Sequence, residues 1–322
     1  MTLTDKLSHA AERKAFETIL DNLIKKGQTQ DAAQVATDLV NMVEKLHSDV
    51  WSENSFQTLR MIANDPDGKW AHYAQRLIRD NDPYILKTFL TNAVYEGGIR
   101  GYHVAQQTAA KYDINVPWLI LMDPTSACNM HCTGCWAAEY GHKQSLTFEE
   151  MDRVLTEGKE LGTHACLFTG GEPLMRKKDM IRLCEKHRDI AFHAFTNGTL
   201  IDRDFCQELL RVKNFIPAIS LEGFEEANDS RRGEGSYQKV GKAMELLREH
   251  GLPFGISTCY TSRNCSDVTS EAFFDFMIES GALRRSLENS RGSAVARLCG
   301  LRLAPLRKIN PLRPDAPTCP RR

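Results

Sequence analysis

From Pro117 onward the chain alternates short apolar runs with longer segments of helical spacing, and this alternation constrains the fold more than any other feature. Repeated β-then-α units predict parallel strands joined by right-handed crossovers. The first helix of the series is expected at Thr147, which forms a capping-box pattern with Glu150. The pattern alone leaves both a barrel and a doubly wound sheet open. The expected strands are Trp118–Met122, Ala165–Phe168, Ala191–Phe195, Ile216–Leu221 and Phe254–Cys259.

Residues 1–112 have a different texture, with apolar residues recurring at helical spacing and no alternating β pattern. We therefore expect a helical N-terminal region, followed by an α/β core over residues 113–282. Within the helical region, Asp82-Pro83 predicts the start of a helix and Gly97-Gly98 predicts its end. Nothing in this region has the spacing of ligand-binding residues.

The composition changes abruptly at Leu283, because residues 283–322 hold ten basic residues against two acidic ones and five of the twelve prolines. No apolar run follows Gly281. We interpret residues 283–322 as an irregular, basic, Pro- and Arg-rich tail that is disordered or not native to the fold. A frameshift or a premature end of the reading frame would produce such a break.

The overall charge excludes a generally basic protein, because 41 Lys and Arg residues stand against 42 Asp and Glu residues in a chain of 322. The sequence therefore gives no strong nucleic-acid signal. No apolar run approaches the ~20 residues of a membrane-spanning helix, and the start does not have the pattern of a signal peptide. We expect a soluble, cytoplasmic protein.

Polar or glycine-rich residues follow each expected strand, where packing alone would not require them. Because the carboxyl ends of the strands form the working face of an α/β barrel, five such ends predict one shared pocket. A cysteine-rich loop follows the first strand. After the next three strands come the turn Gly170–Pro173, then Asn197, and then Ser220 and Glu222.

Three of the ten cysteines, Cys128, Cys132 and Cys135, lie within eight residues of one another. A structural zinc ion needs four ligands and would have to recruit His131 or His142. A cubane iron–sulfur cluster normally takes four cysteines, so three would leave one iron open to another ligand. An open metal position suits catalysis better than a structural role.

The ordered combination of this cysteine loop, the Gly170–Pro173 turn and the Ser220–Gly223 strand end resembles the radical S-adenosylmethionine (SAM) superfamily. The resemblance implies a partial (β/α)6 TIM-like barrel, of which five units are readable here. The sixth strand would begin near Gly281, where no apolar run follows. It also implies a [4Fe-4S] cluster on the three cysteines and SAM bound to the fourth iron. Reductive cleavage of SAM would yield a 5′-deoxyadenosyl radical that abstracts hydrogen from a substrate. A one-electron donor such as flavodoxin or ferredoxin is implied as a partner.

The resemblance also implies the SAM contacts. The turn Gly170, Gly171, Glu172 and Pro173 would receive the amino group, since adjacent glycines let backbone approach a ligand closely. Asn197, Ser220 and Glu222 would lie near the ribose hydroxyls, and Arg232 would pair with the carboxylate. Gly134 stands where relatives often have an aromatic residue, and Trp136 is the candidate replacement beside the adenine.

Substrate and catalytic residues cannot be read from these motifs. Only Cys299 and Cys319 follow the core, without tight spacing, so no second cluster is expected. Two alternatives stay open: a non-catalytic iron–sulfur or zinc-binding protein, and an inactive truncated product of a radical SAM gene.

Overall fold

The computed structural model describes residues 3–29, 37–38, 40–41, 53–65, 69–141, 143–282, 284–289 and 294–295. Within this part, the N-terminal region is helical, as predicted. Its elements are α1 (Leu3–Thr29), α3 (Glu53–Ala63), α4 (Lys69–Asp80), α5 (Pro83–Leu90), the π-helix η1 (Thr91–Gly101) and α6 (Tyr102–Tyr112). No helix among the described residues is both long enough and apolar enough to span a membrane.

Helix α5 begins where the sequence predicts, because the Asp82 carboxylate accepts hydrogen bonds from the backbone N–H groups of Tyr84 and Ile85. The predicted end at Gly97-Gly98 is wrong, since η1 runs through both residues to Gly101 and α6 follows directly. Gly101 is needed for packing: a Cβ atom there would lie 2.3 Å from the carbonyl oxygen of Gly162. Gly97 and Gly98 are therefore interior residues of η1, and a glycine pair does not by itself end a helix.

Five parallel strands match the expected ones to within two residues at each end. Because β1 to β6 stand in chain order without a reversal, the sheet has the arrangement of a barrel rather than of a doubly wound fold. The strands are β1 (Ile120–Met122), β2 (Ala165–Phe168), β3 (Ala191–Thr196), β4 (Phe215–Ser220) and β5 (Gly255–Tyr260). The helices after them are α7 (Phe148–Glu160), α8 (Lys177–Lys186), α9 (Arg203–Val212), α10 (Glu225–Arg232), α11 (Ser236–Glu249), α12 (Cys265–Val268) and α13 (Glu271–Glu279).

The sixth position of the sheet is occupied, contrary to the expectation of an irregular tail from Leu283. Strand β6 (Arg284–Asn289) pairs in parallel with β5 over six residues, and β7 (Ala294–Val295) pairs antiparallel with β6. The strand was missed because its sequence, Arg-Arg-Ser-Leu-Glu-Asn, has no apolar run. The rest of residues 283–322, with Cys299 and Cys319, lies outside the described residues, so its non-native origin stays a prediction.

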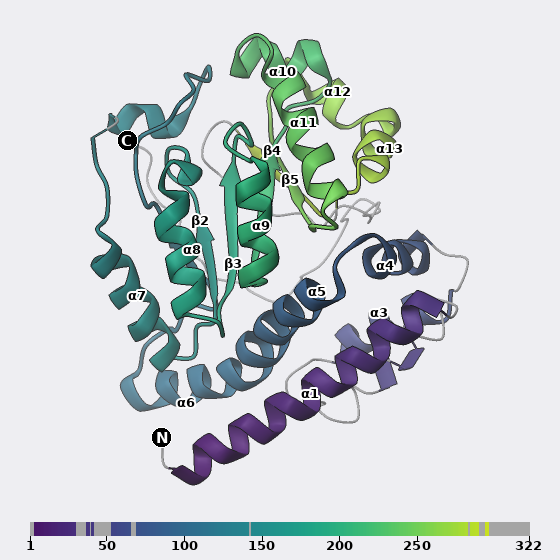
Figure 1. Cartoon of the computed structure of the whole chain (residues 1–322), viewed down its shortest axis with the longest axis vertical. Coiled ribbons are helices and arrows are strands. Elements are labelled where there is room, and N and C mark those ends of the chain that lie inside the picture. Colours follow the sequence, from purple (N-terminus) through teal and green to yellow (C-terminus); the bar gives the residue numbers. More distant parts are fainter. Residues whose placement is uncertain are drawn as a thin grey trace, which may run out of the picture.

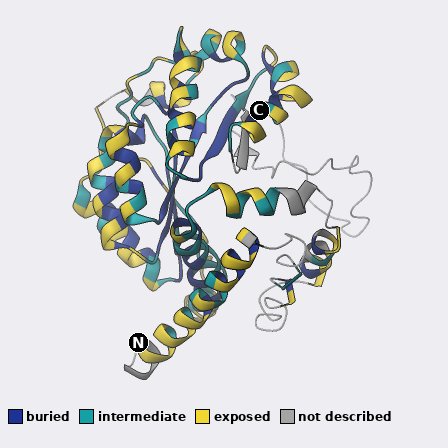
Figure 2. Cartoon of the chain, turned by 45° about the vertical axis from the view of Figure 1, so that its right-hand side comes forward, coloured by how far each residue is buried: buried dark blue, intermediate teal, exposed yellow. Residues whose placement is uncertain are grey.

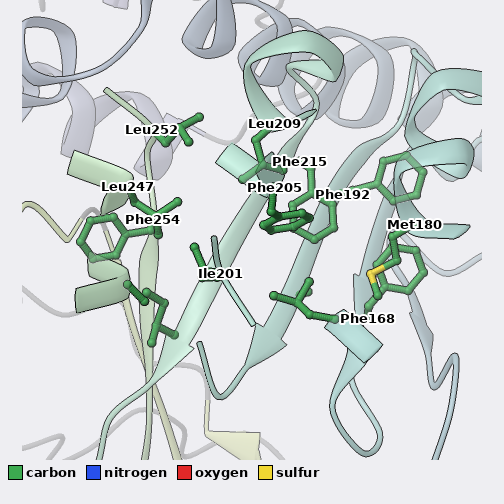
Figure 3. Close-up of a cluster of buried hydrophobic side chains, with 14 of the residues drawn as sticks. Phe168, Met180, Phe192, Ile201, Phe205, Leu209, Phe215, Leu247, Leu252 and Phe254 are labelled. Carbon is green, nitrogen blue, oxygen red and sulfur yellow. The ribbon is translucent and has the colours of Figure 1, made fainter. Parts of the chain in front are cut away.

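The core lies between the sheet and the helices that flank it in Figure 1. Aromatic side chains from successive strands stack there: the rings of Phe168 and Phe192 are 5.6 Å apart and nearly parallel. Phe205 of α9 meets Phe215 of β4 edge-on at 6.0 Å (Figure 3). Three cysteines, Cys166, Cys184 and Cys206, are buried in this cluster as small apolar residues.

The N-terminal helices pack at the amino-terminal ends of the strands, away from the ends that carry the expected site (Figure 1). The Asn92 side chain in η1 donates to the carbonyls of Arg188 and Ile190, which directly precede β3. Helix α1 has both buried and exposed residues along its length (Figure 2), and it packs on η1 through Phe16 and Leu20. This side of the molecule therefore supports the sheet rather than the site.

Candidate active site at the carboxyl ends of the strands

The cysteine loop leaves the sheet after β1 and returns to the same point before α7. Thr125 and Ser145 form an antiparallel bridge, and Ser126 donates its N–H to the Gln144 carbonyl at 2.8 Å. Cys128, Cys132 and Cys135 lie between these closing contacts, and all three are half-buried. Residues 125–127 and 144–145, where the loop closes, form its neck, and this neck fixes the position of the loop relative to the strand ends.

The glycine turn after β2 presses directly against this neck. The Gly171 N–H donates to the Thr125 carbonyl at 2.9 Å, and the Glu172 N–H donates to the Ala127 carbonyl at 2.8 Å. A Cβ atom on Gly171 would lie 2.2 Å from the Ala127 oxygen, and Gly170 has φ +97°, where side chains are strained. The close approach that the two glycines allow is therefore to this chain's own backbone.

Glu172 joins the end of β2 to the end of β3. Its carboxylate is buried and accepts from the Leu174 N–H, from the Thr196 hydroxyl and from the Asn197 N–H, at 2.7 to 2.9 Å. Burial raises the pKa of this carboxyl, while the three donors oppose that shift. The side chain therefore acts as a structural link, although it also lines the cavity described below.

Asn197 connects β3 to the cysteine loop. Its Nδ2 donates to the side-chain oxygen of Asn129 at 2.8 Å, and its own oxygen accepts from the Thr199 N–H at 2.9 Å. Asn129 lies between the first two cysteines, so this contact ties the loop to the third strand end. The cysteines are thus located by hydrogen bonds from two different strands.

Glu222 is fully buried after β4 and is surrounded by donors. One carboxylate oxygen accepts from Arg231 Nη1 at 2.8 Å, and from Arg232 Nε at 2.9 Å and Nη2 at 2.5 Å. The other oxygen accepts from the Cys259 N–H at 2.6 Å. Burial lowers the pKa of the Arg232 guanidinium, but the Glu222 carboxylate and the Cys132 sulfur raise it, and the net direction is upward.

One cavity brings together nearly all of the residues predicted from the motifs. It is lined by the three cysteines, Gly170, Gly171, Glu172, Asn197, Ser220 and Arg232. Pro173 and Glu222 are not among its lining residues: Pro173 is buried at the start of the 3-10 helix η3 (Pro173–Arg176), and Glu222 faces the arginines. The geometry therefore gives no support to a ribose contact from Glu222.

The cavity also includes residues that the motif analysis missed. Arg231, Ser257 and Cys259 line it, as do Met130 and Phe195. Cys259 lies at the end of the fifth expected strand, and this position was a signal that it faces the pocket. The Trp136 side chain is 45% exposed beside the cavity, so its proposed place near an adenine stays a prediction.

The donor set fits a cluster better than a single metal ion. Among the described residues, no three His, Cys, Asp or Glu side chains are gathered as ligands of one ion. A cubane does not require this, because each thiolate binds a different iron. His131 is exposed, and His142 lies outside the described residues, so the zinc alternative gains no support.

The protonation of two of these thiols depends on their burial. Burial raises the pKa of Cys128 and of Cys132, while Arg232 and Arg231 lower that of Cys132. The thiol groups thus stand in a partly dehydrated cavity with guanidinium groups beside one of them. Such surroundings favour thiolates that are neutralised by bound iron over free thiolates.

The fold and the site together define a partial α/β barrel with a three-cysteine loop and a binding cavity at the carboxyl ends of its strands. Residues 122–265 match the model of the radical SAM superfamily. Residues 122–265 therefore form a radical SAM domain, which confirms the resemblance seen in their motifs. This family uses a [4Fe-4S] cluster and SAM.

Curated relatives support the same family. The chain is 31% identical over 166 residues to Fe-coproporphyrin III synthase of Methanosarcina barkeri, covering 50% of this chain and 41% of that protein. It is 29% identical over 175 residues to AdoMet-dependent heme synthase of the same organism, covering 52% and 49%. The chain thus spans less than half the length of these relatives.

A solved structure supports the fold alone. The crystal structure of SuiB from Streptococcus suis matches with a TM-score of 0.50 at 19% identity, covering 80% of this chain and 51% of that chain. This likeness agrees with the partial barrel derived from the strand order.

Proposed function

We propose that this protein is an enzyme that cleaves SAM reductively and uses the resulting 5′-deoxyadenosyl radical to abstract hydrogen from a substrate. The observation that carries the proposal is the single cavity lined at once by three cysteines, a glycine turn, Asn197, Ser220 and Arg232. If each of these residues served only the packing of its own element, they would not need to line the same cavity. Cys128, Cys132 and Cys135 would hold the [4Fe-4S] cluster, which, when bound, supplies one electron to the sulfonium of SAM.

The remaining residues bind and orient SAM. Backbone carbonyls of the Gly170–Glu172 turn accept from its amino group, and Asn197 and Ser220 face its ribose. Arg232 pairs with its carboxylate, while Glu222 orients the guanidinium rather than touching SAM. A flavodoxin or ferredoxin delivers the electron, and the reducing cytoplasm keeps the thiols available.

The names of the relatives point to more than one class of substrate. The relatives named above carry tetrapyrrole names, whereas others are a cysteine-type anaerobic sulfatase-maturating enzyme of Clostridium perfringens and a PqqA peptide cyclase of Granulibacter bethesdensis. Each likeness covers about half of this chain or less. The proposal therefore concerns the step that such enzymes share, the generation of the radical.

Anaerobic reconstitution with iron and sulfide, followed by dithionite and SAM, tests the proposal. We expect about four irons per chain and the appearance of 5′-deoxyadenosine. Cys128→Ala should abolish both, whereas Cys265→Ala, at an exposed cysteine outside the cavity, should change neither. A non-catalytic iron–sulfur protein would bind iron without forming 5′-deoxyadenosine, and an inactive truncated product would do neither.

A further inference from the structure

Arg231 and Arg232 are neighbours in sequence, but their guanidinium groups have different surroundings. Arg232 bonds Glu222 through Nε and Nη2, and its Nη1 lies 3.9 Å from the Sγ atom of Cys132. This distance is at the long end for an N–H···S hydrogen bond. Arg231 shares the same Glu222 oxygen through Nη1, and its backbone carbonyl accepts from the Thr133 N–H. Within the part of the chain that the structure describes, Arg232 is therefore the one of these two cations that contacts the sulfur of a predicted cluster ligand.

The orientation of Arg232 is fixed by the protein itself. Glu222 is 0% exposed, and its second carboxylate oxygen accepts from the Cys259 N–H at the end of β5. The Glu222 backbone carbonyl also accepts from the Asn264 side chain at 2.9 Å. With two of its nitrogens on Glu222, the Arg232 guanidinium cannot turn away from Cys132 without breaking two charge-assisted hydrogen bonds.

The charges around Cys132 do not cancel. Two guanidinium groups share one carboxylate, which leaves an excess of one positive charge at this wall of the cavity. A second buried carboxylate, Glu172, lines the cavity; it follows β2 and already accepts three hydrogen bonds. A reduced cluster carries one more negative charge than an oxidised one, so a cation held beside a ligating sulfur stabilises the reduced form.

We propose that Arg232, held by Glu222, is a positioning residue for the cluster, and that its Nη1 donates to the Cys132 thiolate and raises the reduction potential. This role rests on the proposed function, since Cys132 must hold the cluster, and it operates before SAM binds. It adds to the pairing of Arg232 with the SAM carboxylate. The contact lowers the energy needed to load the electron that SAM cleavage consumes.

The test is the midpoint potential of the reconstituted cluster, measured without SAM by a redox titration followed by electron paramagnetic resonance. Arg232→Gln should shift the potential negatively by about 59 mV or more, which is a tenfold lower ratio of reduced to oxidised cluster at a fixed potential. Arg231→Gln, which removes an equal charge from the same wall, should shift it by less than half as much. Equal shifts in the two variants, or no shift in Arg232→Gln, would overturn the proposal.

A second pair of variants keeps the positive charge at each position but removes the guanidinium group, and with it, at Arg232, the contact with the Cys132 sulfur. Arg232→Lys should still shift the potential negatively, whereas Arg231→Lys should leave it at the wild-type value. The two lysine variants test the proposal even if Arg232→Gln takes up no cluster. Equal reduction potentials in the two lysine variants would overturn the proposal. Failure of the proposed function would look different, because the wild-type protein would then show no four-iron cluster to titrate.

Discussion

Replacing Gly171 with alanine should separate the glycine turn from the cysteine loop. The added Cβ atom would stand 2.2 Å from the Ala127 oxygen and 2.6 Å from the Ser126 oxygen. Both are backbone atoms of the neck of the loop, so neither can move aside as a flexible side chain would. The variant must therefore displace the neck or the turn.

The expected cost follows from the contacts that this displacement breaks. Overpacking a tight site costs typically about 1–3 kcal/mol. The hydrogen bonds from the Gly171 and Glu172 N–H groups to the neck contribute roughly 1 kcal/mol each. We therefore expect Gly171→Ala to lower the free energy of unfolding by about 3–5 kcal/mol, and to reduce iron uptake because the cysteines lose their fixed positions.

The assay is anaerobic urea unfolding of the apo-protein, combined with iron and sulfide analysis after reconstitution. The matched control is Gly241→Ala in α11, where an added Cβ meets nothing within 4 Å. That variant should be neutral or gain up to ~1 kcal/mol, since alanine favours helix over glycine. Equal stability and equal iron content in the two variants would refute the role given to Gly171.

Three further predictions concern buried polar groups. Glu172→Gln turns an acceptor of three hydrogen bonds into a group that faces donors with its own N–H2, so it should lower the free energy of unfolding by about 1–3 kcal/mol in urea titrations. Burial lowers the pKa of His164 below its ordinary value of 6.5, because the charged imidazolium is poorly solvated there. The contribution of His164 to the free energy of unfolding should be full above about pH 6.5 and fall as the pH decreases, by at most about 1.4 kcal/mol per pH unit. His164→Gln should flatten that part of a pH–stability curve, and an unchanged curve would exclude this group as the cause. Glu96→Gln removes the buried carboxylate in η1 that pairs with Arg13 of α1. The free energy of unfolding should fall by about 1–3 kcal/mol, and hydrogen exchange should become faster mainly in α1. Unchanged exchange in α1 would contradict a role of this ion pair in holding α1 against η1.

The parts of the fold that sequence predicts well are those where local pattern and tertiary structure agree. The first five strands are apolar runs between amphipathic helices, so their positions along the chain could be read directly. Strand β6 could not, because Arg284–Asn289 has no apolar pattern, and only its pairing with β5 makes it a strand. Gly97-Gly98 likewise looked like a helix end, whereas η1 runs through both residues to Gly101.

The sequence predicted most of the residues that meet at the cavity, but not which groups each of them contacts. Motif spacing brought the cysteines, the glycine turn, Asn197 and Arg232 to one cavity, since strand ends of a parallel sheet meet at one face. It did not reveal that Glu222 faces the arginines instead of the cavity, because a carboxylate after a strand looks the same in either role. Arg231 and Cys259 were missed for the same reason: exposure to a cavity depends on the packing of α10 and β5.

In the proposed function, SAM meets an iron–sulfur cluster held by Cys128, Cys132 and Cys135. The most direct test is the electron paramagnetic resonance spectrum of the reduced, reconstituted protein with and without saturating SAM. We predict a [4Fe-4S]+ signal that changes when SAM is added and that disappears when the three cysteines are replaced by alanine. A signal that SAM leaves unaltered, or one that survives the triple replacement, would contradict the account.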